Sequence, residues 1–119
     1  MKSKKEILKK VCEAIEEKKG DELRILDISE ICSFTDFFVL CHGYNQRQNQ
    51  AICDSIKECL KKQDQISPFH IEGYDSAEWI LMDYIDFVVH IFSPESRGFY
   101  KLERLWSDGV ELTRDIIIA

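Results

Sequence analysis

The stretch WILMDYIDFVVHIF, residues 79–92, decides the fold of this chain. Its two apolar runs, residues 79–82 and 87–92, each have the length of a strand. Only residues 83–86 separate them, and a connection this short joins neighbouring antiparallel strands. The stretch therefore predicts a β-hairpin.

Upstream of the hairpin the sequence predicts three more strands, at residues 23–28, 37–41 and 69–72. The run 37–41 contains no polar residue, which is typical of an interior strand in a sheet covered on both sides. Apolar residues with helical spacing predict helices over residues 4–19 and 46–62. Ser3 and Asn45 are suited to cap these helices, and Gly20 to end the first one.

Downstream of the hairpin, Ser93-Pro94-Glu95 has the features of a helix start, and that helix is expected to end near Trp106. Residues 115–118 either add an edge strand or stay frayed, within a tail over 109–119. The predicted order αββαβββα, without a linker or repeat, indicates an α/β fold. We expect a single domain over residues 1–119, with a mixed five-stranded sheet and helices packed on its faces.

The charge distribution restricts the class of partner. The 119 residues carry 16 Lys and Arg against 22 Asp and Glu, a net charge of −6. No Lys or Arg occurs between Gln63 and Ser96, whereas seven acidic residues do. Such a surface repels phosphate backbones, so we expect little direct contact with nucleic acid. It suits a basic protein partner or a divalent cation, and a merely solubilising acidic face is the alternative.

Cysteine usage and hydropathy bear on the compartment. The five cysteines are irregularly spaced, with no C-x-x-C, which fits reduced thiols in a cytoplasmic protein. No apolar run follows the basic start as in a secretory signal, and none approaches the roughly 20 residues that span a membrane.

Signals for catalysis are weak. The chain contains no phosphate-binding glycine loop, nucleophile elbow or H-E-x-x-H zinc motif. Cys41 beside His90 could form a nucleophile pair, although an isolated histidine in a strand is more often structural. Asp83 and Asp86, joined by Glu72 or Asp36, could hold a metal ion, but hairpin turns recruit aspartate for backbone reasons as well.

Aromatic residues within the acidic stretch suggest an interface. Side chains alternate along a strand, so Trp79, Leu81 and Asp83 are expected to project from one face. A tryptophan beside acids at a sheet surface is typical of a protein-binding anchor. The alternative is that Trp79 is half-buried core.

Several segments together resemble one known family. They include TDFFVLCHG (35–43), WILMDY (79–84), VVHIF (88–92) and RGFYKLERLW (97–106), in order and at the family's spacing. By these motifs the chain is similar to the ribosomal silencing factors, also called RsfS or Iojap-like proteins, over about residues 4–108.

The resemblance implies a non-enzymatic protein with a nucleotidyltransferase-like fold and no cofactor. Family members bind the large ribosomal subunit through its intersubunit-face protein, the fourteenth in the large-subunit series, and sterically block joining of the small subunit. Translation is thereby repressed. A homodimeric scaffold without a ribosomal role is one alternative, since exposed strand edges invite pairing. A metal-dependent nucleotidyltransferase is the enzymatic alternative.

The matched motifs also imply site residues. Trp79 would be the apolar anchor and Asp83 and Asp86 the partners of Lys or Arg, with Tyr84 and His90 beside them. Arg97, Tyr100 and Glu103 match the family's helix motif and serve either the partner or internal packing.

Two positions depart from the family pattern. Ile85 stands where the family usually has glycine, so we expect a hairpin turn of another type, without a positive φ. His42 stands where a small residue is more common.

Overall fold

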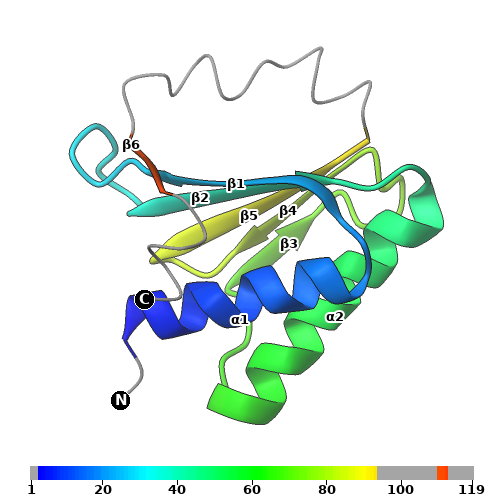
Figure 1. Ribbon diagram of the computed structural model, residues 1–119, viewed down its shortest axis with the longest axis horizontal. Helices are drawn as coiled ribbons and strands as arrows, with labels where there is room; N and C mark the ends of the chain where they lie inside the picture. The colour runs from blue at the N-terminus through cyan, green and yellow to red at the C-terminus, as the bar shows by residue number, and fades with distance from the viewer. Residues whose placement is uncertain (1–2, 94–109, 113–119) are drawn as a thin grey trace.

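The computed structural model describes residues 3–93 and 110–112, and these form two helices and one six-stranded sheet (Figure 1). In chain order the elements are α1 (Lys4–Glu17), β1 (Asp21–Asp27), β2 (Phe37–His42), α2 (Gln46–Asp64), β3 (His70–Glu72), β4 (Trp79–Asp83), β5 (Phe87–Phe92) and β6 (Val110–Leu112). The helix expected after Ser93 and the alternatives for residues 115–118 lie outside the described residues.

The sheet is mixed, with strand order β3-β4-β5-β2-β1-β6. The predicted hairpin is confirmed as the antiparallel pair β4–β5, with Trp79 opposite Phe92 and Asp83 opposite Val88. β2 pairs with β5 in parallel, the one parallel pair among the described strands. The five expected strands are all present, and the short β6 adds to the free edge of β1.

Both helices pack on the same face of the sheet (Figure 1). Their apolar stripes meet the inward side chains of β2, β4 and β5 in a helix-side core. Its fully buried members include Val11, Ile15, Ile52, Ile56, Leu60, Val39, Cys41, Ile80, Met82, Val89 and Ile91. Neither described helix is long and apolar enough to span a membrane.

The opposite face of the sheet carries its own apolar group, the second-face cluster. Trp79 and Leu81 of β4 pack against it, which confirms that they project from one face. Every residue of β5 is buried, as expected for an interior strand with apolar contacts on both sides. The buried members of the cluster are Leu26, Ile28, Phe38, Leu40, Val88 and Phe92.

The ends of the helices are set by local chemistry. The predicted caps are confirmed: the Ser3 hydroxyl accepts the Glu6 N–H, and the Asn45 side chain accepts the Gln48 N–H. At the end of α1 the left-handed residue is Lys19, with φ 62°, and not Gly20. Gly20 serves close packing instead, since a Cβ there would lie 2.5 Å from Cγ2 of Ile15.

Candidate functional site

Trp79 enters β4 from a tight loop. Gly73, with φ 79°, turns the chain, and a Cβ at this position would lie 2.1 Å from the Trp79 carbonyl oxygen. Asn49 of α2 holds the other side of the loop: its fully buried amide donates to the Ala77 carbonyl at 2.7 Å and accepts the Gly43 N–H at 2.9 Å. The start of β4 is therefore fixed to both α2 and the end of β2.

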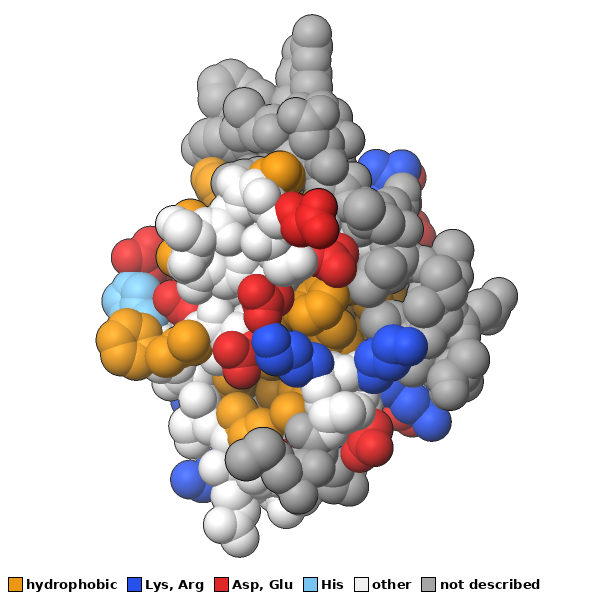
Figure 2. Space-filling view, turned by 90° about the vertical axis from the view of Figure 1, so that its left-hand side faces the viewer, with side chains coloured by type: hydrophobic (Ala, Val, Ile, Leu, Met, Phe, Trp, Pro, Cys, Tyr) orange, Lys and Arg blue, Asp and Glu red, His pale blue; other side chains and the backbone are white. Residues whose placement is uncertain are grey.

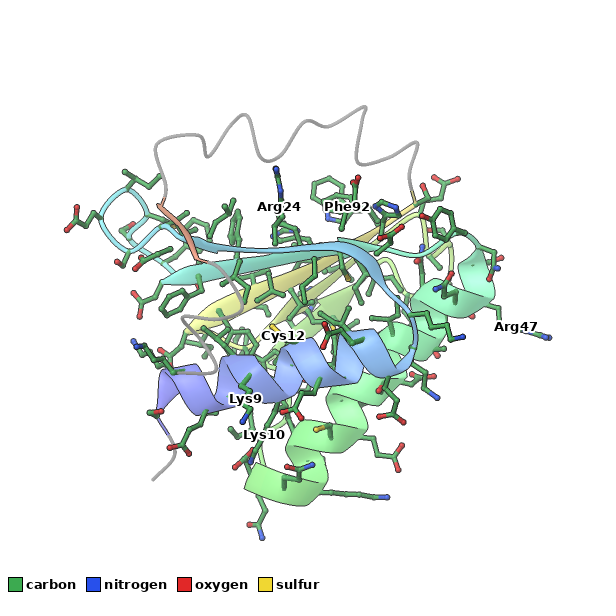
Figure 3. All side chains as sticks on the ribbon, viewed as in Figure 1. Lys9, Lys10, Cys12, Arg24, Arg47 and Phe92 are labelled. Atoms are coloured by element: carbon green, nitrogen blue, oxygen red, sulfur yellow. The ribbon has the colours of Figure 1, made fainter. Side chains whose placement is uncertain are left out.

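The Trp79 side chain is half-buried and held on two sides. Its ring stacks on Phe92 with centroids 5.2 Å apart, and its Nε1–H donates to Nδ1 of His90 at 3.1 Å. Figure 3 shows Phe92 rising from the sheet on the face away from the helices. The indole thus lies on the second face in one orientation, fixed by packing and a directional bond.

His90 is an uncharged member of this aromatic group. It is 3% exposed, and its ring meets Phe38 edge-on with centroids 4.6 Å apart. Burial lowers the pKa of His90 to about 3, so the imidazole is neutral at physiological pH. Because Nδ1 accepts the indole hydrogen, Nε2 carries the ring's own hydrogen, and this buried donor has no partner among the described residues.

Asp83 shapes the hairpin turn. Its Oδ1 accepts the Ile85 N–H at 2.8 Å, and the Asp86 N–H donates to the Tyr84 carbonyl at 2.9 Å. Ile85 has φ 74°, which together with this i→i+2 bond is typical of the rare classic γ-turn. The expectation of a turn without positive φ was therefore wrong. The two hydrogen bonds hold an isoleucine in the conformation for which glycine is better suited.

Tyr84 lies away from this surface. Its side chain turns into the helix-side core, where its ring stacks on Phe87 with centroids 4.8 Å apart. It is 7% exposed, and burial raises the pKa of its phenol well above the ordinary value. Tyr84 can therefore support the turn from beneath, but it presents almost no surface to a partner.

Asp86 is exposed beside the start of β2. Its carbonyl accepts the Asp36 N–H at 3.1 Å, and the Asp36 carboxylate accepts a hydrogen bond from the Lys4 ammonium. This contact raises the pKa of Lys4, with smaller contributions from Asp86 and Asp27. Four of the expected site residues, Trp79, Asp83, Asp86 and His90, thus belong to β4, β5 and their turn, at or beside the second face.

The described residues do not form either of the two catalytic arrangements that the sequence suggests. Cys41 points into the helix-side core, whereas His90 lies in the aromatic group on the opposite face, so they form no nucleophile pair. Within residues 3–93 and 110–112, no group of three His, Cys, Asp or Glu side chains could hold a metal ion.

His42 ends β2 as a buried residue, and its ring lies edge-on to the ring of Tyr44, with centroids 5.3 Å apart.

One surface residue was missed from the sequence. Phe69 was interpreted as a strand residue, but it precedes β3, is 74% exposed, and donates its N–H to the Asp83 carbonyl at 2.7 Å. Pro68 was the available signal, because proline in a sheet is confined to edges and strand starts. Arg97, Tyr100 and Glu103 lie outside the described residues.

Comparison with known proteins decides the family. The family model described as "Ribosomal silencing factor during starvation" matches residues 1–117. The chain belongs to the ribosomal silencing factor family. The ribosomal silencing factor RsfS of Halalkalibacterium halodurans is 35% identical over 117 residues, covering 98% of this chain and 99% of that protein. The RsfS of Bacillus subtilis is 38% identical over 104 residues, 87% of each chain.

A solved structure and a distant relative agree with the family. A crystal structure of a Chromobacterium violaceum protein superposes with a TM-score of 0.85 at 34% identity, covering 89% of this chain and 88% of that one. A mouse protein named "Mitochondrial assembly of ribosomal large subunit protein 1" is 28% identical over 72% of this chain and 39% of its own length. The family is one of ribosome-associated regulators of translation.

Proposed function

We propose that this chain binds the large ribosomal subunit through the fourteenth protein of the large-subunit series and sterically prevents the small subunit from joining. In this proposal it acts in the cytoplasm as a single domain over residues 1–119, with a nucleotidyltransferase-like topology. It performs no catalysis and needs no cofactor. Translation is repressed because a blocked large subunit cannot enter an assembled ribosome.

The observation that carries the proposal is the fixed, half-buried indole of Trp79 on a strand that ends in an acidic turn. Stacking on Phe92 and the bond to His90 remove the rotamer freedom that an anchor would otherwise lose on binding. A pre-organised tryptophan at the centre of an interface contributes about 2 kcal/mol or more. Trp79 is therefore the proposed apolar anchor.

The charged partners of the proposal are Asp83 and Asp86. Both lie in the stretch between Gln63 and Ser96 that has no lysine or arginine, so no neighbour in the sequence neutralises them. A basic ribosomal protein offers lysine and arginine for such carboxylates, whereas ribosomal RNA is repelled. The surface thus favours a protein on the ribosome over its RNA.

His90 and Tyr84 have supporting roles in this proposal. His90 orients the indole through Nδ1, and Tyr84 packs beneath the turn that presents Asp83 and Asp86. A second copy of the chain is the other candidate occupant, because β3 is an edge strand of the sheet. Sedimentation of the free protein distinguishes a homodimer from a monomer.

Co-sedimentation with isolated large subunits tests the proposal. The wild-type chain should move with large subunits through a sucrose gradient, and Trp79→Ala should weaken binding by about thirtyfold or more, about 2 kcal/mol. Gln63→Ala is the control, since it truncates an exposed, uncharged side chain of α2, on the opposite face of the sheet from Trp79. A wild-type chain that stays at the top of the gradient would contradict the proposal.

A further inference from the structure

The exposed apolar side chains are unevenly distributed. Five large hydrophobic residues of the described chain are exposed, and four of them, Ile31, Phe34, Phe69 and Ile85, lie in loops at one end of the sheet. At that end β1 and β4 finish while β2, β3 and β5 begin. Tyr44, the fifth, lies at the opposite end. Clustered exposure of this kind marks an interaction surface more often than scattered single residues do.

Backbone hydrogen bonds join these loops into one surface. The Phe69 N–H donates to the Asp83 carbonyl at 2.7 Å, and the Asp36 N–H donates to the Asp86 carbonyl at 3.1 Å. Figure 2, which looks onto this end, shows acidic side chains beside hydrophobic ones, with Lys or Arg side chains among them. We call the set the sheet-end surface: Phe34, Asp36, Phe69, Asp83, Ile85 and Asp86.

The chain itself shows that this surface accepts an ammonium group. The Nζ of Lys4 donates to Asp36, and the charges of Asp36, Asp86 and Asp27 all raise the pKa of Lys4. The side chain of Lys4 is 54% exposed, so a cation from a partner can displace it at little cost. Lys4 therefore marks a position at which this surface holds a cation.

Ile85 adds an observation independent of charge. A β-branched side chain held at φ 74° and 55% exposed gains little from burial in the free protein. Strained residues of this kind persist where the surroundings fix them, and they cluster at binding sites. The turn thus presents an exposed apolar side chain that lies between two acidic residues, Asp83 and Asp86, in the sequence.

We propose that the docking interface extends from Asp83 and Asp86 over the rest of the sheet-end surface, where a basic segment of the same ribosomal protein binds. This inference rests on the proposed function. An apolar side chain of that segment packs against Phe69 and Ile85, and a neighbouring lysine or arginine displaces Lys4 from Asp36. A second copy of the chain is a poorer occupant because its acidic residues would face these acidic residues.

Binding to isolated large subunits tests the apolar contact. The double variant Phe69→Ser/Ile85→Asn removes both apolar side chains, and asparagine tolerates a positive φ. We expect its Kd for large subunits to rise about tenfold. Tyr44→Ser is the control and should bind as the wild type does.

Three results would overturn the inference, and they are distinguishable. Wild-type affinity of the double variant, with Trp79→Ala weakened, would leave the proposed function standing without this extension of the interface. Absence of wild-type binding would remove the proposed function as well. A homodimer of the free protein that Phe69→Ser dissociates would assign the surface to a second copy.

A charge-matched pair of variants tests the role of Lys4. Lys4→Gln frees Asp36 for the partner, so binding to large subunits at low salt should tighten by about threefold. Lys5→Gln changes the net charge by the same amount and should have a clearly smaller effect. Equal effects of the two variants would show that only net charge matters, and would contradict a specific cation position at Asp36.

Discussion

Trp79 donates its indole N–H to Nδ1 of His90 across the β4–β5 hairpin, at 3.1 Å. The bond lies between residues on neighbouring strands whose rings also share Phe92 as a stacking partner. It determines the orientation of the indole and the tautomer of the imidazole at once. The indole of the proposed anchor is therefore held in one orientation in the free protein.

A double-mutant cycle measures how much this hydrogen bond contributes to the free energy of unfolding. Trp79→Phe keeps a stacked ring but leaves a buried imidazole nitrogen without its donor, so the free energy of unfolding should fall by about 1–2 kcal/mol. Adding His90→Phe removes the orphaned acceptor as well and should recover most of that loss. Urea unfolding of the four proteins gives the coupling, and additive effects would contradict a hydrogen bond of this strength.

The buried imidazole predicts a pH dependence of stability. In the unfolded chain His90 takes up a proton near pH 6.5, whereas in the fold its pKa is about 3. Between these values the unfolded state binds more protons, so stability is complete above pH 6.5 and falls as the pH decreases.

The expected slope for this single group is about 1.4 kcal/mol per pH unit below pH 6.5. Urea unfolding of the wild type and His90→Phe between pH 7.5 and 5.5 checks it, because the other histidines are common to both proteins. The slope of the wild type should approach that excess only near pH 5.5, so the wild type should lose about 1.4 kcal/mol more than His90→Phe over the whole range. Parallel slopes would show that His90 is not buried as a neutral group.

Ile85→Gly should stabilise the fold. A non-glycine residue in the left-handed region destabilises the fold by about 1–2 kcal/mol. Glycine removes this strain, but part of the gain is lost because glycine gives up more conformational entropy on folding. We expect a net rise of about 0.5–1 kcal/mol in the free energy of unfolding. Ile85→Ala is the control: it shortens the exposed side chain but keeps the strain, so it should give no such gain.

Asp83→Asn separates the two roles of this carboxylate. An asparagine oxygen still accepts the Ile85 N–H, so stability should change by less than about 0.5 kcal/mol. The lost charge should weaken binding to large subunits at low salt, and the difference should disappear at high salt. Asp75→Asn makes the same charge change before the other end of β4 and should bind normally. A loss that persists at high salt would assign Asp83 to the turn alone.

Local patterns in the sequence predicted most of the elements. Apolar runs gave β2, β4 and β5, helical spacing gave α1 and α2, and Ser3 and Asn45 cap as expected. These features depend on neighbours in the chain, which a sequence displays directly. The strand β6 was not predicted, and it forms by pairing with the edge of β1, a contact between residues far apart in the sequence.

Features that depend on contacts between strands were not predictable in the same way. Tyr84 follows Asp83 in the chain, yet it packs inward while the turn points outward. The positive φ of Ile85 is imposed by two hydrogen bonds, from the Ile85 N–H to the Asp83 carboxylate and from the Asp86 N–H to the Tyr84 carbonyl, against the preference of isoleucine itself. The family motif contains all five proposed site residues, and the fold places some of them at the surface and others beneath it.

Joining of the ribosomal subunits tests the central claim most directly. Purified large and small subunits are mixed with magnesium after the large subunits have been incubated with excess protein, and assembled ribosomes are measured by sucrose-gradient sedimentation. We expect the wild-type chain to shift the profile from assembled ribosomes to free subunits, and Trp79→Ala at the same concentration to leave it largely unchanged. An undiminished peak of assembled ribosomes with the wild-type chain in excess would contradict the account.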